Sequence, residues 1–283
     1  MSALSLISEH PCYGGVQRFY EHSSSETRGP MKFGAYFPPQ ARERKVPVLY
    51  FLSGLTCTEE TFPIKGHAQM AAAQLGLMLI SPDTSPREPR LAGDADSWDF
   101  GYSAGFYLDA TQAPWREHYR MYSYVTAELP ALIASSLPVA AGNSGIFGHS
   151  MGGHGALICA LRNPHTYKSV SAFAPIAAPM RCPWGRNAFA RYLGKDVEAW
   201  RKYDASELVA AKRFPGTILI DQGGADKFLA EQLLPEQFAA AAASSGQPVD
   251  LRMQPGYDHG YYFIQSFIPD HLRHHAARLI GAG

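Results

Sequence analysis

The stretch 144–157, SGIFGHSMGGHGAL, decides the fold of this chain. A short apolar run enters the turn Gly148–Gly152, and an Ala- and Leu-rich helical stretch over 151–161 leaves it. A strand, a GxSxG turn and a helix in this order are typical of a nucleophile elbow, which projects a serine hydroxyl above a sheet edge. Ser150 is therefore the candidate nucleophile. The alternative is a Gly-rich helix start with an idle serine. A phosphate-binding loop is disfavoured because no Gly-Lys-Ser/Thr ending and no GxGxxG spacing is present.

Apolar runs of strand length alternate with helical stretches along the rest of the chain. This pattern predicts an α/β fold: a mostly parallel central sheet, antiparallel N-terminal strands and helices on both faces. The expected strands are 16–20, 31–36, 46–53, 77–81, 145–149, 169–174, 217–222 and 249–254. The expected helices are 67–75, 119–135, 151–161 and 261–279, the last with a break suggested by Pro269. We expect one domain over 1–283, with irregular insertions at about 82–114 and 175–194.

Composition excludes several classes of function. Lys and Arg total 25 and Asp and Glu total 25, so the formal net charge is zero and the clustered basic surface of a nucleic-acid binder is not expected. No segment reaches the ~18 consecutive apolar residues of a membrane helix. The first residues lack the basic start of a secretory signal. Four widely spaced cysteines without a CxxC pair indicate free thiols, so we expect a cytoplasmic protein without membrane or nucleic-acid partners.

A serine hydroxyl needs a general base, and the base needs a carboxylate that orients it. After a nucleophile elbow, the chain order is serine, acid, histidine. Asp226 lies on the Gly-rich turn after strand 217–222, and His259 lies between strand 249–254 and the last helix. Asp221, inside the strand run, is the alternative acid. These positions predict Ser150, Asp226 and His259 as a catalytic triad.

The other histidines fit the role of base less well. His149 precedes the nucleophile and is expected to point elsewhere, and His154 is expected to be packed or to act as a cap on the following helix. His271, His274 and His275 have helical spacing, but the nearest carboxylate, Asp270, faces another way, which favours a solvated helix face over a metal site. Asp258 is expected to cap the last helix.

An oxyanion hole needs two backbone N–H groups close to the nucleophile. Met151, directly after Ser150, offers one, and Leu55, in the loop 53–58 after a predicted strand, offers the other. Cys57 lies in the same loop. It is either a small buried thiol or a thiol beside the pocket that blocks the site when it is oxidised or alkylated.

Taken together, these motifs resemble the S-formylglutathione hydrolase (esterase D) family over nearly the whole chain. The matching stretches are SGLTCT at 53–58, SPDTSPR at 81–87, WDFGYSAGFYL at 98–108, GHSMGGHGAL at 148–157, SAFAPIAAP at 171–179, IDQGGAD at 220–226 and PGYDHGYYF at 255–263. The resemblance implies an α/β-hydrolase fold and the hydrolysis of S-formylglutathione to glutathione and formate in formaldehyde detoxification. It also implies a cytoplasmic enzyme without a cofactor, often a homodimer.

The same resemblance assigns roles residue by residue. It implies that Ser150 is the nucleophile, Asp226 the acid and His259 the base, with Leu55 and Met151 as oxyanion donors and Cys57 beside the pocket. We further expect the insertion 82–114, with Trp98 and either Arg87 or Lys65, to contact the glutathione peptide. Two departures, Glu88 and Ser103 where the family pattern has glycine, fall in this insertion.

Two other functions remain open on the sequence alone. The first is a carboxylesterase or thioesterase of broad specificity, or a polysaccharide-ester hydrolase of similar fold, because a triad does not select the leaving group. The second is a non-catalytic binding module with a hydrolase-like fold. The presence of all three triad residues in the required order disfavours the second.

Overall fold

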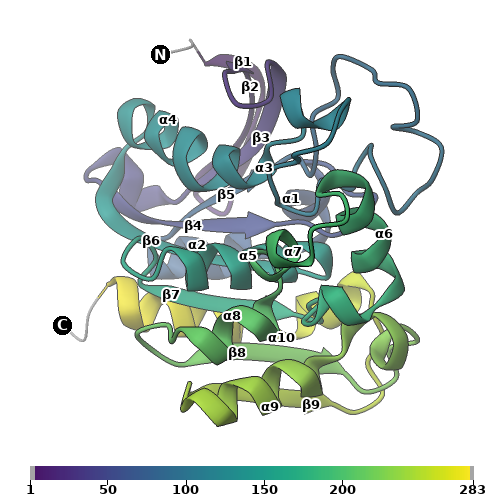
Figure 1. The fold of residues 1–283 in the computed structure, drawn as a ribbon. Helices are drawn as coiled ribbons and strands as arrows, with labels where there is room; N and C mark the ends of the chain where they lie inside the picture. Colours follow the sequence, from purple (N-terminus) through teal and green to yellow (C-terminus); the bar gives the residue numbers. More distant parts are fainter. Residues whose placement is uncertain (1–3, 281–283) are drawn as a thin grey trace.

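The computed structural model describes residues 4–280 and is built on one sheet of nine strands (Figure 1). Their order across the sheet is β1-β2-β3-β5-β4-β6-β7-β8-β9. Strands β1 to β3 pair antiparallel with their neighbours, whereas β5, β4, β6, β7, β8 and β9 pair parallel with one another. The predicted α/β sheet is therefore confirmed. The strands are β1 Ser5–Cys12, β2 Gly15–Ser24, β3 Gly29–Phe37, β4 Val46–Leu52, β5 Met78–Pro82, β6 Val139–His149, β7 Ser169–Phe173, β8 Ile218–Gly223 and β9 Val249–Gln254.

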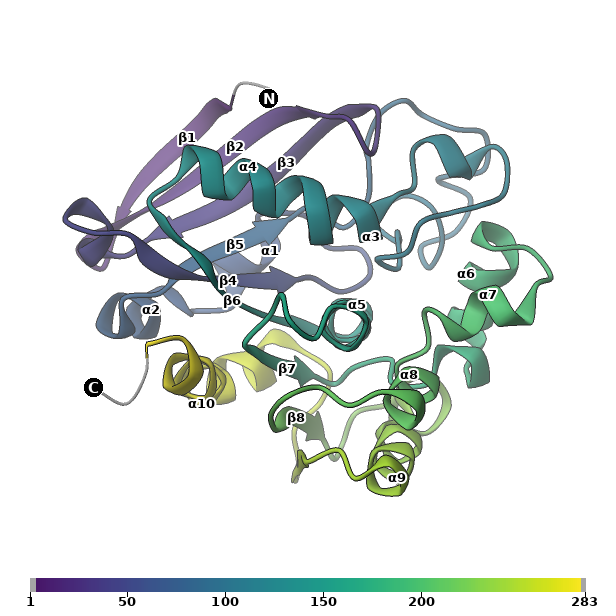
Figure 2. The ribbon, with the colours of Figure 1, turned by 60° about the vertical axis from the view of Figure 1, so that its left-hand side comes forward.

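Helices cover both faces of this sheet (Figure 2). Helices α2 and α10 contact each other and pack on one face, whereas α5 packs on β4, β6 and β7 from the other. The helices are α1 Thr61–Lys65, α2 Gln69–Leu75, α3 Met121–Ser123, α4 Leu129–Ser136, α5 Met151–Arg162, α6 Pro183–Tyr192, α7 Val197–Arg201, α8 Ala205–Ala211, α9 Pro235–Ser245 and α10 Tyr261–Leu279. None of the helices within residues 4–280 is long and apolar enough to cross a membrane.

Three elements differ from the sequence prediction. Strand β1 was not expected, because this exposed edge strand carries no apolar alternation. The stretch 175–194 is not irregular throughout, since it contains α6, in which Pro183 occupies the first turn, where a proline costs no hydrogen bond. Pro269 lies inside α10 without ending it. The buried face of α10, which includes Ile264, Ile268 and Leu272, holds the helix together across the proline.

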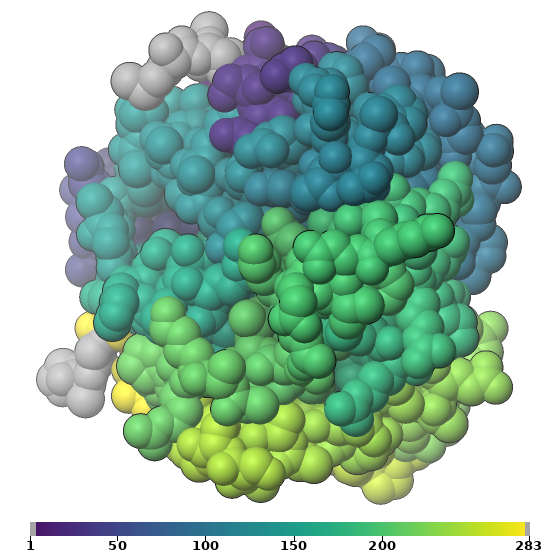
Figure 3. Space-filling model, viewed as in Figure 1, coloured from purple at the N-terminus to yellow at the C-terminus, as the bar shows by residue number. Residues whose placement is uncertain are grey.

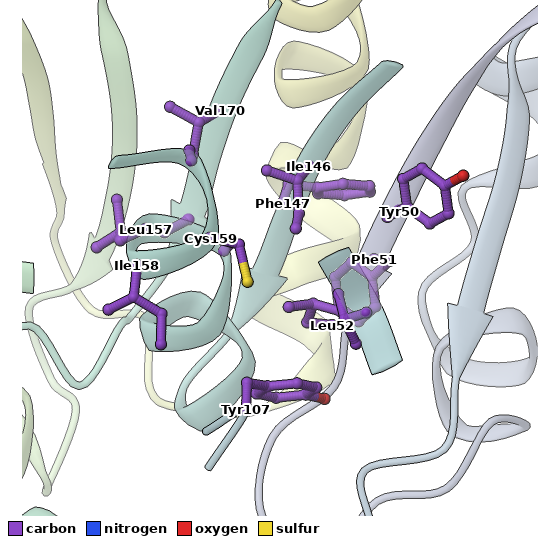
Figure 4. Close-up of a cluster of buried hydrophobic side chains, with 14 of the residues drawn as sticks. Tyr50, Phe51, Leu52, Tyr107, Ile146, Phe147, Leu157, Ile158, Cys159 and Val170 are labelled. Carbon is purple, nitrogen blue, oxygen red and sulfur yellow. The ribbon is translucent and has the colours of Figure 1, made fainter. Parts of the chain in front are cut away.

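The centre of the core lies between β4, β6 and α5. Figure 4 shows buried side chains from both faces of these strands: Phe51 and Leu52 come from β4, Phe147 from β6 and Leu157 from α5, with Tyr107 from the irregular segment near Leu52. The ring of Phe51 stacks on that of Phe62 with their centroids 3.6 Å apart. These strands are buried on both faces, which explains why they read as continuous apolar runs rather than as alternating ones.

A buried polar network joins α10 to the sheet and corrects the prediction of a solvated histidine face. His271 and His275 are fully buried. The hydroxyl of Ser171 lies between them, 2.8 Å from His271 Nδ1 and 2.9 Å from His275 Nε2. His271 Nε2 lies 3.0 Å from Asp221 Oδ2, and Arg252 Nε donates to Asp221 Oδ1 at 2.8 Å. Asp221 of β8 thus joins α10 to β9, and Ser171 joins α10 to β7, so Asp221 belongs to this network and not to the pair with His259.

The network is sensitive to acid. Burial alone would raise the pKa of Asp221, but hydrogen bonds from His271, Arg252 and Gln254 lower it to about 2. Burial lowers the pKa of His271 to about 4, against an opposing hydrogen bond to Asp221. The unfolded chain therefore binds protons before the folded chain does, at His271 between pH 6.5 and 4 and at Asp221 between pH 3.8 and 2. Acid destabilises the fold through both groups.

We predict that Asp221→Asn lowers the free energy of unfolding by about 2–3 kcal/mol at pH 7.5, because the amide replaces the buried carboxylate to which His271 and Arg252 are hydrogen-bonded, and Arg252 is left with its more exposed partner Asp270. The wild type itself should lose stability between pH 6.5 and 4, where burial opposes protonation of His271. Urea unfolding at pH 7.5 and at pH 4.5 measures both effects. The matched control is Asp250→Asn, an exposed carboxylate on β9, which should change stability by less than about 0.5 kcal/mol. Equal effects of the two substitutions would contradict the network's role.

Candidate active site

Ser150 occupies a strained turn between β6 and α5. Its backbone angles are φ 58° and ψ −118°, a conformation that costs free energy in residues other than glycine. The flanking glycines make the turn possible: a Cβ on Gly152 would lie 1.9 Å from the carbonyl oxygen of Leu52, and one on Gly148 would lie 2.2 Å from that of Gly152. The N–H of Ser150 donates to the Phe173 carbonyl of β7 at 2.9 Å. The turn is therefore held from both sides at the carboxyl edge of the sheet.

Asp226 and His259 come together at the same edge, from the turns after β8 and β9. His259 Nδ1 lies 2.6 Å from Asp226 Oδ2, and the carboxylate is fully buried. The backbone N–H of Phe228 donates to Asp226 Oδ1 at 2.9 Å, and Gln222 Nε2 donates to Oδ2 at 3.3 Å. A carboxylate fixed in this way orients the imidazole so that Nε2 is free to accept a proton.

Ser150 and His259 line the same cavity, which has a volume of about 360 Å³. Within the described structure no hydrogen bond joins the Ser150 hydroxyl to the His259 ring. Without substrate, such pairs are often loose and tighten only when the substrate is bound. The pair can therefore act as nucleophile and general base across this cavity.

The two predicted oxyanion donors, Leu55 and Met151, lie close to Ser150. Leu55 lines the cavity, and Met151 is the first residue of α5, directly after Ser150. Among residues 4–280, neither the Leu55 N–H nor the Met151 N–H has a protein acceptor. Two free N–H groups, one of them at the positive end of a 12-residue helix, can hold a developing oxyanion.

Side chains from the segment after β5 clamp the oxyanion loop 53–58, and sequence reasoning did not find this role. Thr84 Oγ1 and Arg87 Nη2 donate to the Cys57 carbonyl at 2.6 and 3.1 Å, and the Tyr107 hydroxyl donates to the Ser53 carbonyl at 2.9 Å. Arg87 also pairs with Asp83 and does not line the cavity, so the expectation that it contacts a bound peptide is not supported. The SPDTSPR motif was the available signal, but it does not show what Arg87 binds.

Ser103, one of the two departures from the family pattern, belongs to this clamp. Its φ of 61° explains why glycine is expected there. Its hydroxyl accepts a hydrogen bond from Arg87 Nη1 at 2.6 Å, and its carbonyl accepts one from the Thr56 N–H at 3.2 Å. The serine therefore adds a contact to Arg87 in exchange for an unfavourable backbone conformation.

An aromatic wall leads from the surface to His259. The exposed Trp98 packs edge-on against Trp184, with ring centroids 5.4 Å apart. The ring centroid of Phe228 lies 4.7 Å from that of Trp184 and 5.1 Å from that of His259. In Figure 3 the irregular segment and the stretch that includes α6, which carry the two tryptophans, adjoin on one face of the molecule. Lys65 supplies the cationic side chain of the cavity. The wall and this lysine suit a polar, anionic ligand with an extended chain.

The predicted roles of His149 and Asp258 were wrong. His149 does not point away from the site but lines the cavity beside His259. Asp258 accepts from the Gly260 N–H at 2.8 Å, but Gly260 is the N-cap of α10 and no side chain caps this helix. Cys57 does line the cavity, and burial raises the pKa of its thiol, which leaves it a poor nucleophile.

His154 is packed under the site, with Nε2 3.0 Å from the Phe106 carbonyl. Within residues 4–280 no group of three or more His, Cys, Asp or Glu side chains is arranged to hold a metal ion.

Comparison with known proteins shows which family the chain belongs to. A family model described as "Putative esterase" matches residues 24–274. S-formylglutathione hydrolase from Rattus norvegicus is 56% identical over 278 residues, covering 98% of this chain and 99% of the relative. The protein of the same name from Paracoccus denitrificans is 52% identical over 277 residues, with coverage of 98% and 99%. A solved S-formylglutathione hydrolase from Agrobacterium tumefaciens superposes with a TM-score of 0.93 at 48% identity, covering 97% and 99% of the two chains.

We predict that Asp226→Asn lowers turnover of any ester substrate by about 10³–10⁴, because the amide no longer favours the imidazole tautomer that accepts a proton at Nε2. Asp258→Asn, next to His259 in the same loop, is the control and should stay within about threefold of the wild type. Steady-state hydrolysis of p-nitrophenyl acetate measures both variants, with circular dichroism to confirm folding. A folded Asp226→Asn variant with wild-type turnover would exclude Asp226 as the acid.

Proposed function

Since this chain belongs to the S-formylglutathione hydrolase family of esterases, we propose that it hydrolyses the thioester of S-formylglutathione to glutathione and formate through a formyl-serine intermediate. The observation that carries the proposal is that Ser150 and His259 line one cavity, while His259 Nδ1 lies 2.6 Å from the buried carboxylate of Asp226. The high sequence identity to enzymes of that name, over nearly the whole chain, supports the choice of substrate.

In the first half of the proposed reaction, Ser150 Oγ attacks the thioester carbonyl carbon while His259 Nε2 takes its proton. The imidazolium is held by the buried carboxylate of Asp226, and the oxyanion by the N–H groups of Leu55 and Met151. The carbon–sulfur bond then breaks. Glutathione leaves as a thiol that receives its proton from His259, or as a thiolate, in which case His259 passes its proton to solvent before the second half.

In the second half, water attacks the formyl ester on Ser150. His259 takes a proton from the water and returns it to Ser150 Oγ as the carbon–oxygen bond breaks, which releases formate. Because the formyl group is the smallest acyl group, most of the binding energy has to come from the glutathione part. The aromatic wall that starts at Trp98, with Lys65 as a partner for a carboxylate, is where we place that part.

The remaining expectations are proposals as well. We propose that the enzyme is cytoplasmic, where the four cysteines, all free in the structure, stay reduced, and that it acts in formaldehyde detoxification without a cofactor. We also propose a homodimer, as the family resemblance implies. Neither a nucleic acid nor a membrane is proposed as a partner.

The first test compares S-formylglutathione, S-acetylglutathione and a p-nitrophenyl ester as substrates of the wild type and of Ser150→Ala. We predict the highest kcat/KM on the formyl thioester and a loss of turnover of about 10⁴–10⁶ in the variant. Similar kcat/KM values for all three substrates, still dependent on Ser150, would indicate a carboxylesterase or thioesterase of broad specificity. Activity that survives in Ser150→Ala would reject the nucleophile.

The second test concerns the aromatic wall. Trp98→Ala should raise KM for S-formylglutathione by about tenfold, because one large aromatic contact is worth on the order of 1–2 kcal/mol, and should leave hydrolysis of p-nitrophenyl acetate nearly unchanged. Tyr262→Ala is the matched control, since this tyrosine is 82% exposed and does not line the cavity. Unchanged kinetics of Trp98→Ala on both substrates would remove Trp98 from the substrate site.

A further inference from the structure

His149 is a buried histidine next to the catalytic machinery to which the proposed reaction gives no role. It ends β6, directly before Ser150, and is only 6% exposed. Its ring lies 4.5 Å from the ring of His259, centroid to centroid, at an angle of 44°. The backbone of Gly54 in the oxyanion loop also packs against it, since a Cβ there would lie 3.4 Å from His149 Nδ1. His149 therefore lies between the oxyanion loop and the loop of the base.

Neither ring nitrogen of His149 completes a hydrogen bond within the described structure. A buried polar atom without a partner costs on the order of 1–3 kcal/mol. A phenylalanine would fill the same space without that cost, so packing alone does not explain a histidine here. The cost is recovered if the nitrogens gain a partner in a state that forms during the reaction.

One candidate partner is the backbone carbonyl of His259, which already affects the pKa of His149. Burial lowers the pKa of His149 well below its usual value, the charge of a protonated His259 lowers it further, and the His259 carbonyl opposes both effects. His149 is thus a neutral imidazole at the pH of the reaction. It has one N–H to donate and one lone pair to offer.

We propose that His149 is a positioning residue for the general base: its N–H tightens onto the carbonyl of His259 during the reaction and, with its ring packed on the His259 ring, holds the imidazole between Asp226 and Ser150. The proposal deepens the function proposed above and rests on His259 as the base. It requires the nitrogens of His149 rather than its shape.

This positioning also affects how well the charged form of His259 is stabilised. The imidazolium that forms on His259 is stabilised as long as its Nδ1 stays on the Asp226 carboxylate, and His149 keeps it there. Loss of His149 should therefore loosen the pairing of His259 with Asp226, and the acid limb of the kcat/KM profile should move to lower pH. The other titratable groups that face or adjoin His259 are Asp226 after β8, Cys57 after β4, Lys65 in α1, Tyr261 in α10 and Asp258 in its own loop.

The test compares His149→Phe, which keeps a ring and removes both nitrogens, with His149→Gln, which keeps an N–H donor and removes the ring. The substrate is p-nitrophenyl acetate, so the outcome does not depend on glutathione binding. We expect kcat of His149→Phe to fall about tenfold with KM nearly unchanged, and the acid limb of its kcat/KM profile to move down by about 0.5 pH unit. His149→Gln should recover part of both losses.

His154→Gln is the control for replacing a buried histidine in general. This side chain packs on Phe106 and Phe189, and the substitution should lower thermal stability without moving the acid limb. If His149→Phe does not fold, the proposal is tested by comparing the acid limb of the kcat/KM profile of His149→Gln with that of His154→Gln. The proposal is overturned if the acid limb stays in place in the folded His149 variants, or if His149→Phe keeps the kcat of the wild type. Equal rates on thioester and aryl-ester substrates would weaken the proposed function but leave this result intact.

Discussion

The left-handed backbone of Ser150 is the constraint on which the rest of the site depends. At φ 58° the residue turns the chain from β6 into α5 within one step, and this turn lifts the hydroxyl above the sheet. The strain is maintained by the surroundings: glycines where a Cβ would collide with the backbone of Leu52, and a hydrogen bond to β7. The acid, the base and the oxyanion loop are all placed relative to this one turn.

The triad residues were predictable because each stands in a short sequence motif directly after a strand. A GxSxG turn, a Gly-rich turn with Asp226 and a turn with His259 each follow a recognisable strand, and parallel strands bring their carboxyl ends to one edge. The parallel strands were predictable as well, because continuous apolar runs are also a local signal. The edge strand β1 lacks such a run, and Pro183 and Gly185 in α6 look like helix breakers although the proline stands at the helix start.

Interactions between distant residues were not predictable in this way. His271 and His275 lie at helical spacing among polar residues, which is also the pattern of a solvated face, and their partner Ser171 is about a hundred residues away. Arg87 is similar, because a cation near the site suggests a ligand for substrate until its pairing with Asp83 is known. For His149, burial beside His259 follows from the packing of two loops and not from the residues next to it.

The base loop and the last helix form one continuous piece of chain: His259 stands two residues before α10 begins. That helix is fastened to the sheet through His271, Ser171 and Asp221 at its far half, not through a cap at its start. The position of the base is therefore tied to the anchoring of the C-terminal helix. A shift of this helix would carry the proton acceptor away from a nucleophile turn that is itself unchanged.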